Sequence, residues 1–123
     1  MLTPIAYGYA ALLNLFVIFI GLRFLLVPQA AAAGYGVPAK KDGDAAYLTI
    51  KGSRDFVYGI IGLGLLAFVG APAEAWFMLL VALVPLFDTV IVLRNGGAKA
   101  AAFGIHFATA VAVLVSAVLL FLV

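Results

Sequence analysis

The chain has 123 residues, of which 67% are hydrophobic and only 10% are charged. A soluble domain carries roughly 25% charged residues, and a small domain leaves much of its surface in water, so this composition excludes an ordinary soluble domain. The sequence contains no cysteine, which excludes a disulfide framework, a thiolate metal site and a thiol nucleophile. The net charge is +2, but the basic residues do not form a stripe on a soluble surface, so nucleic acid is not an expected partner.

Four apolar runs follow one another along the chain, at residues 5–27, 46–69, 73–94 and 99–123. Each is close to the ~20 residues that a helix needs to cross about 30 Å of hydrocarbon. Pro28 ends the first run, because proline cannot continue a helix, and Gly96 and Gly97 follow the third. The sequence therefore predicts one domain, 1–123, an all-α integral membrane bundle of four antiparallel helices in up-down order, surrounded by the lipid bilayer.

The basic residues predict the orientation of this bundle. All seven flank the first or the third connection: Arg23, Lys40, Lys41, Lys51, Arg54, Arg94 and Lys99. The opposite side has Glu74 and both termini, but no basic side chain. Under the positive-inside rule, segments 28–45 and 95–98 are cytoplasmic and both termini lie outside, in a plasma or inner membrane. Turn-forming and charged residues predict a solvent-facing loop over 28–45.

Five charged or titratable residues fall within the runs, about 6–13 Å inside the cytoplasmic border at 1.5 Å per residue: Arg23, Arg54, Asp55, Asp88 and His106. A charge at the centre of a membrane helix costs roughly 2.5–3.5 kcal/mol, so we expect these groups to face inward and to pair. Guanidinium groups pair well with carboxylates. Lys51 and Asp55 lie four residues apart on one helix face, as do Arg54 and Tyr58.

Each of these residues also has a structural interpretation. Arg23 and Lys51 can serve as interfacial anchors, and Arg54 and Asp55 as an ion pair that sets the packing of the bundle. For Asp88 a functional role is favoured over a structural one, since it lies among apolar residues and acids inside membrane segments are functional by default. If His106 meets it, the two could hold one tautomer or relay a proton. One histidine and distant carboxylates match no known metal spacing, so neither a metal nor another cofactor is expected.

Small residues recur every four positions on the fourth run, at Gly104, Ala108, Ala112 and Ser116. Such spacing lets helices approach closely, so these residues predict a packing seam, either within one protomer or across a homodimer. Gly59, Gly62 and Gly64 are candidates for the same role on the second run. Asn14, deep in the first run, is interpreted as a polar contact between helices.

Several strings carry a family resemblance. Gly21-Leu22-Arg23-Phe24, Pro28 with Gly34-Tyr35-Gly36, and the motifs around Lys51-Gly52-Ser53-Arg54-Asp55, Asp88 and His106 span the whole chain. Together they resemble a family of small four-span integral membrane proteins of unknown function, with a fainter architectural likeness to DoxX-like membrane proteins. The resemblance implies a four-helix fold and no particular reaction.

The predicted function is binding of a small lipophilic or amphipathic ligand at a polar site in the cytoplasmic half, since apolar walls with a few polar groups suit such a molecule. The candidates for ligand binding or proton relay are Asp88, His106, Arg54, Asp55, Arg23 and Tyr58. Three alternatives remain open: a membrane isomerase or hydrolase with a lipophilic substrate, an oligomeric proton-coupled transporter, and a structural or partner-binding protein. Against transport, only Asn14 continues the polar layer toward the outer side.

Overall fold

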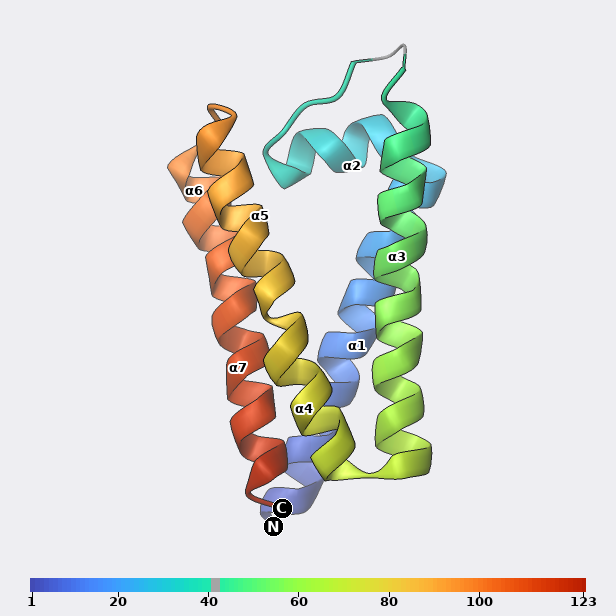
Figure 1. Cartoon of the computed structure of the whole chain (residues 1–123), viewed down its shortest axis with the longest axis vertical. Helices are drawn as coiled ribbons and strands as arrows, with labels where there is room; N and C mark the ends of the chain where they lie inside the picture. The colour runs from blue at the N-terminus through green and yellow to red at the C-terminus, as the bar shows by residue number, and fades with distance from the viewer. Residues whose placement is uncertain (41–42) are drawn as a thin grey trace.

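A computed structural model shows a bundle of four long helices, and it describes residues 1–40 and 43–123 (Figure 1). In chain order the elements are α1 (Leu2–Leu26), α2 (Pro28–Tyr35), α3 (Ala45–Gly64), η1 (Leu65–Val69), α4 (Ala71–Val81), α5 (Leu83–Arg94), α6 (Lys99–Ala101), η2 (Ala102–Phe107) and α7 (Ala108–Phe121), where η marks a π-helical turn. Four continuous segments are long and apolar enough to span a membrane: Leu2–Leu26, Ala45–Val69, Ala71–Arg94 and Lys99–Phe121. The predicted all-α four-helix bundle is confirmed.

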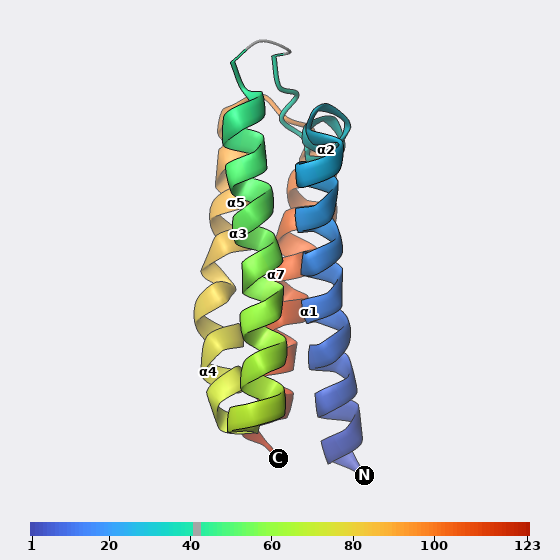
Figure 2. The same cartoon turned by 90° about the vertical axis from the view of Figure 1, so that its right-hand side faces the viewer.

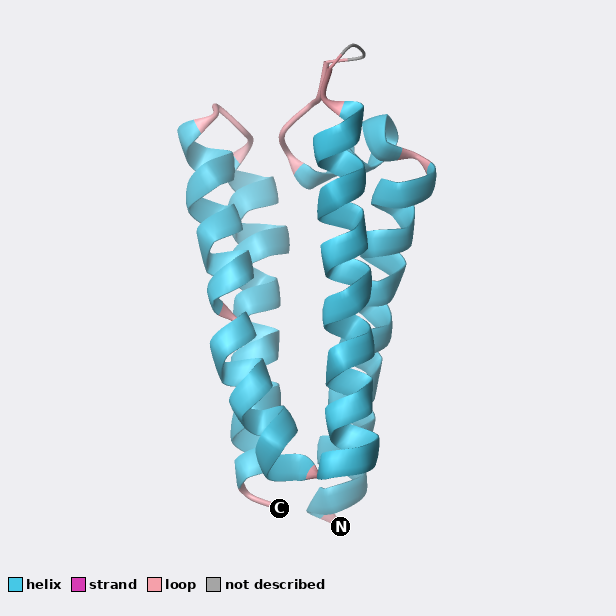
Figure 3. Ribbon diagram, turned by 45° about the vertical axis from the view of Figure 1, so that its right-hand side comes forward, coloured by secondary structure: helices cyan, strands magenta, loops and turns pink. Residues whose placement is uncertain are grey.

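The four spans form two antiparallel pairs. α1 lies along α3, and the span made of α4 and α5 lies along the span that ends in α7 (Figure 2). The two pairs meet where both chain termini lie and diverge toward α2 (Figure 3). We call these two ends of the bundle the termini end and the α2 end. The main apolar core therefore lies at the termini end, built from α1, η1, α4 and α7.

Small side chains fill this interior, whereas large apolar side chains cover its outside. Ala6, Ala10 and Ala75 are fully buried. By contrast, Phe68 is 89% exposed and Leu80 is 62% exposed. Because lipid tails are as apolar as leucine, membrane helices associate through close packing of small residues. This arrangement is the one expected of a small four-span membrane protein.

Segment 28–45, predicted to be a loop, contains the helix α2. Pro28 occupies its first turn, where the missing N–H costs nothing, and Gly36 ends it with a φ of 103°. Ala31 and Ala32 on α2 are buried against Phe24 of α1. α2 thus lies across the open end of the bundle, between the two helix pairs (Figure 1). Of the predicted loop residues, Lys41 lies outside the described part of the chain.

Two features of the spans position the site below α2. Glycines bring α1 and α3 into backbone contact: a Cβ atom built on Gly52 would lie 2.8 Å from the carbonyl oxygen of Gly21. On the third span, Pro85 removes the N–H that would bond to Val81, and the helix is interrupted at Ala82. The close contact holds α1 and α3 together as one pair, whereas the irregular segment at Pro85 belongs to the other pair.

Candidate functional site

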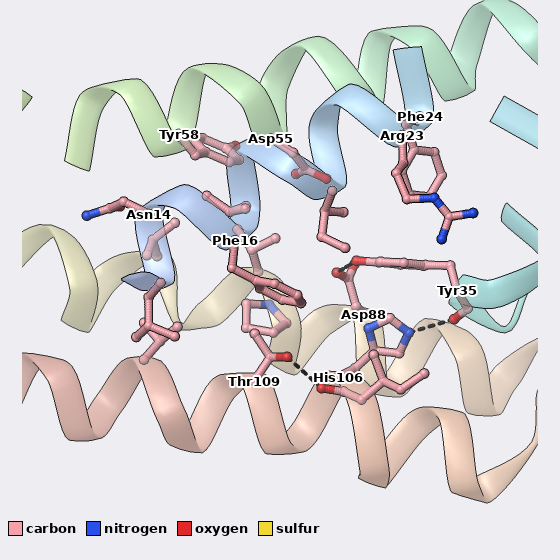
Figure 4. Close-up of a pocket in the computed structure, with 18 of the residues that line it drawn as sticks. Asn14, Phe16, Arg23, Phe24, Tyr35, Asp55, Tyr58, Asp88, His106 and Thr109 are labelled. Carbon is pink, nitrogen blue, oxygen red and sulfur yellow. Dashed lines mark hydrogen bonds between the residues drawn. The ribbon is translucent and has the colours of Figure 1, made fainter. Parts of the chain in front are cut away.

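A cavity of about 250 Å³ lies between the two helix pairs, toward the α2 end. Its walls are mostly apolar, with Phe16, Val17 and Ile20 from α1, Met78 and Val81 from α4, and Val113 from α7. Its polar lining residues are Asn14, Arg23, Tyr35, Asp55, Tyr58, Asp88, His106 and Thr109. Figure 4 shows most of these polar side chains gathered at the end of the cavity nearest α2, with Asn14 at the other end. The cavity therefore has a polar end and a long apolar part.

Tyr35, at the tip of α2, is the central residue of the polar end. Its hydroxyl donates a hydrogen bond to Oδ2 of Asp88 on α5. Its ring stands edge-on to Phe24, with centroids 5.4 Å apart, and lies 4.1 Å from the ring of His106. Burial, together with the negative charge of Asp88, raises the pKa of the Tyr35 phenol well above its usual value. The phenol therefore stays neutral and remains a donor to Asp88.

The π-helical turn η2 directs His106 into the same cluster. The ring is buried, with 2% of its surface exposed, and Nε2 lies 2.6 Å from the backbone oxygen of Tyr35. Since a carbonyl oxygen only accepts hydrogen bonds, Nε2 carries the proton. In the neutral ring, Nδ1 is then a free acceptor on the other side (Figure 4). π turns occur frequently at functional sites.

The sequence left open whether Asp88 and His106 meet, and the structure joins them through Tyr35. In the described part of the chain no hydrogen bond links the two side chains directly. Tyr35 bonds to Asp88 through its hydroxyl and to His106 through its backbone oxygen. The three residues come from α5, α2 and η2, so their meeting depends on α2 lying across the bundle.

Asp55 has a cation partner, but not an arginine. Its carboxylate is 2.5 Å from Nζ of Lys51, one turn earlier on α3, which confirms the predicted contact between these residues. The same ammonium lies over the rings of Phe24 and Tyr35, at 4.3 and 4.2 Å from their centroids, an arrangement favourable for a cation. The expected pairing of carboxylates with arginines is not present among residues 1–40 and 43–123, where this is the only ion pair.

The remaining candidates separate into two groups. Arg23 and Tyr58 line the cavity, and Figure 4 shows Arg23 at the same end of it as Tyr35 and Phe24. Arg54 is exposed and lines neither this cavity nor the second one described below. Its predicted place in the polar layer is therefore wrong. Successive residues of a helix point about 100° apart, so Arg54 turns away when Asp55 faces inward.

A second cavity, of about 320 Å³, lies on the other side of Tyr35. It is bordered by the segment that follows α2, by Leu48 and Lys51 of α3, and by Ile91 and Val92 of α5. Phe24, Tyr35 and Asp88 line both cavities. The Tyr35 side chain and its bond to Asp88 therefore form part of the partition between the two spaces.

The predicted packing seam on the fourth span divides into two parts. Ser116 is fully buried inside the protomer, and Ala112 accepts a hydrogen bond on its backbone oxygen from Tyr9 of α1. Gly104 and Ala108 are exposed, and a Cβ on Gly104 would meet nothing within 4 Å. The structure thus places Ser116 out of reach of a second protomer. Close helix contact occurs instead between α1 and α3, where Gly59 and Gly62 face Ile18 and Asn14.

The described residues 1–40 and 43–123 contain no group of three or more His, Asp or Glu side chains that could hold a metal ion. His106 and Asp88 are each engaged with Tyr35, and Asp55 with Lys51. The polar end can therefore donate and accept hydrogen bonds, and it presents one guanidinium, that of Arg23, which has no carboxylate partner in this part of the chain.

Comparison with known proteins agrees with this description. Searches of curated proteins and of solved structures gave no match. The family model for a domain of unknown function, DUF4267, matches residues 14–120, which include every polar residue that lines the first cavity. The chain is thus a small four-span membrane protein that belongs to the DUF4267 family, whose function is unknown.

Proposed function

We propose that the first cavity binds a small amphipathic molecule, with its apolar body between the helix pairs and its polar head at Tyr35, Asp88 and Arg23. The observation that carries this proposal is the asymmetry of the cavity lining, which is apolar over most of its length and polar near α2. Ligand sites in proteins combine apolar walls with a few placed polar groups. The volume of 250 Å³ lies just below the roughly 300–1,000 Å³ of pockets for drug-sized ligands, which suits a short chain or a single ring system.

The charges at the polar end favour a head group that is anionic or rich in hydrogen-bond acceptors. Lys51 and Asp55 neutralise each other. The Arg23 guanidinium has several donors in a planar fork that suits a carboxylate or a phosphate. Asp88 uses Oδ2 for Tyr35, so its other oxygen is the acceptor for a ligand hydroxyl or amide. Nδ1 of His106 supplies a second acceptor in the same region.

Tyr35 controls which side of the bundle this head group can reach. Its side chain borders both cavities, and its hydroxyl bond to Asp88 crosses the boundary between them. A head group that passes from one cavity to the other must displace Tyr35 from Asp88. Movement of α2 is the simplest way to do so, because α2 is a short helix that rests on the ends of the bundle through Ala31 and Ala32.

Native mass spectrometry of the purified protein tests the proposal with a matched pair of variants. Val84 lines the cavity, whereas Val90, on the same helix, is 52% exposed on the outside. The Val84→Phe substitution fills the cavity, while Val90→Phe adds the same atoms on the lipid side. We expect a small molecule to copurify with the original protein and with Val90→Phe, and to be lost from Val84→Phe.

An Asp88→Ala variant, checked for folding by circular dichroism, locates the head group. Loss of the same molecule from this variant would place its polar part at Asp88. If all four proteins retain the same bound mass, the molecule is ordinary lipid on the outer surface, and the cavity is not its binding site. A bound molecule lost only from Val90→Phe would refute the proposal directly.

A further inference from the structure

Among residues 1–40 and 43–123, the most deeply buried acid lies outside the first cavity and its polar end. Glu74, one turn into α4, was placed by its sequence position at the outer border of the membrane. The structure gives it no exposed surface at all. Its Oε1 accepts a hydrogen bond of 2.8 Å from the side-chain amide of Asn14 on α1, and its Oε2 is buried without a partner among the residues that the structure describes. The structure thus keeps Glu74 on the side of the termini, as expected, and adds it to the buried polar groups there.

Among residues 1–40 and 43–123, no lysine, arginine or histidine side chain forms an ion pair with Glu74. The elements packed against α4 are α1, α3, η1 and α7, and the charged side chains of α1 and α3, such as Arg23 and Lys51, lie toward the α2 end. α1 brings Tyr7, which packs on the adjoining core, and Tyr9, whose hydroxyl bonds to α7. The sequences of η1, α7 and α4 contain no other titratable side chain. An uncompensated buried charge is strongly destabilising, so the carboxyl group carries a proton while the surrounding helices stay closed.

Asn14 connects this acid to the cavity. The side chain of Asn14 borders the cavity at the end opposite Tyr35 (Figure 4). Its amide nitrogen donates a hydrogen bond to Glu74. Gly62 of α3 makes room for it, because a Cβ at that position would overlap the Asn14 amide as it now lies. The glycine thus allows the asparagine to lie between the cavity and the acid.

We propose that Glu74 is an exchangeable-proton site, reached from the cavity by water that displaces the Asn14 side chain, with the proton passing between a carboxyl oxygen of Glu74 and that water. One carboxyl oxygen of Glu74 has no hydrogen-bond partner among the described residues, which is rare for a buried polar group. This oxygen is therefore the one that can hold and release a proton. Ionisable residues inside membrane segments commonly form proton relays. The proposal concerns the protein without a ligand, so it stands apart from ligand binding in the cavity.

Infrared difference spectroscopy of the protein in lipid vesicles tests whether the proton is exchangeable. Between about pH 5 and about pH 9, a range that buried carboxyl groups commonly reach, we expect the carbonyl band of a protonated carboxylic acid to disappear. The band should be missing in Glu74→Gln and retained in Asp88→Asn. A Glu74-dependent band that is unchanged across this range would mean an acid that never releases its proton, and would overturn the proposal. The absence of any such band would mean a carboxylate that is always ionised, and would overturn it as well.

Exchange into D₂O tests the route. Deuteration shifts the acid band, and we expect this shift to be several-fold slower in Val84→Phe, where the cavity is filled, than in Val90→Phe. Equal rates in the two variants would overturn the route through the cavity. Circular dichroism confirms that each variant is folded. Because no ligand is present, failure of ligand binding in mass spectrometry leaves this result unaffected.

Discussion

The close contact between α1 and α3 predicts an unusually large cost for adding one methyl group. In Gly52→Ala, the new Cβ would lie 2.8 Å from the Gly21 oxygen and 2.9 Å from the Leu25 nitrogen. Both are backbone atoms of α1, which cannot turn aside as a flexible side chain can. Gly64 is the matched control on the same helix, because a Cβ there meets nothing within 4 Å.

The magnitudes follow from two opposing effects. Replacing glycine by alanine inside a helix gains about 0.8–1 kcal/mol of helix propensity. Overpacking a close contact costs typically 1–3 kcal/mol, and sometimes more. We therefore expect Gly64→Ala to raise the free energy of unfolding by up to about 1 kcal/mol, and Gly52→Ala to lower it by about 1–2 kcal/mol, because the nearest atoms belong to the backbone.

Unfolding in mixed micelles with increasing dodecyl sulfate, followed by far-ultraviolet circular dichroism, measures both variants. The difference between them is the informative quantity, since propensity is common to both and cancels. If Gly52→Ala is as stable as Gly64→Ala, α1 and α3 are not held at backbone contact, and the reasoning from this contact is refuted.

Three further predictions concern the polar end and the orientation. Lys51→Met leaves the buried Asp55 without its cation, so it should lower the free energy of unfolding by about 3 kcal/mol. This is the lower end of the range for a broken buried pair, because the Lys51 side chain is 27% exposed. The double variant Lys51→Met/Asp55→Leu should recover most of this loss in the same unfolding assay. The pKa of Tyr35 lies above its usual 10.0, so the folded state favours the neutral phenol. The free energy of unfolding should therefore be unaffected below about pH 10 and fall above it, where Tyr35 ionises in the unfolded chain. During alkaline titration of the folded state, Tyr35→Phe should show the same tyrosinate absorbance change as the original protein, and a smaller change would refute this. Since the sequence has no cysteine, single-cysteine variants report orientation: in intact cells an impermeant maleimide should label Thr3→Cys but not Ala98→Cys, and the reverse pattern would overturn the positive-inside prediction.

The spans were predictable because hydrophobic length and helix breakers act locally. Pro28, Gly70 and Gly96 end or separate the helices where their backbone chemistry requires it. Asp55 and Tyr58 were also found from the sequence, and they line the cavity together because residues three apart share a helix face. The same rule excludes Arg54, which directly precedes Asp55. Helical spacing applied more strictly would have separated the two.

Tyr35 was missed because its role depends on tertiary structure. The segment around it is short, rich in alanine and glycine, and flanked by turn-forming residues, so it has no apolar period that would reveal a buried side chain. Its position becomes clear only when α2 packs over Phe24 and reaches Asp88. The string Gly34-Tyr35-Gly36, an aromatic residue between two turn formers, was the only local signal.

The burial of Glu74 was not predicted, for a related reason. A charged residue one turn from the start of a span is compatible with a position at the membrane surface, and the sequence does not show which face of α4 is covered. Contact with α1 and α7 at the termini end buries that face. Depth along a helix is readable from sequence, whereas direction around it requires the partner helices.

The π-helical turn η2 makes the fourth span sensitive to chain length as well as to residue type. A π turn holds an extra residue compared with an α-helical turn. Deleting one residue between 102 and 107 would allow a regular helix there and would leave the two flanking segments on the faces that they now present, because the π turn accommodates one residue more than an α-helical turn of the same rotation. The residues of the turn itself, His106 among them, are the ones whose directions would change. Alignments of related chains should therefore treat a gap in this turn as a change of the site, even where every aligned residue is identical.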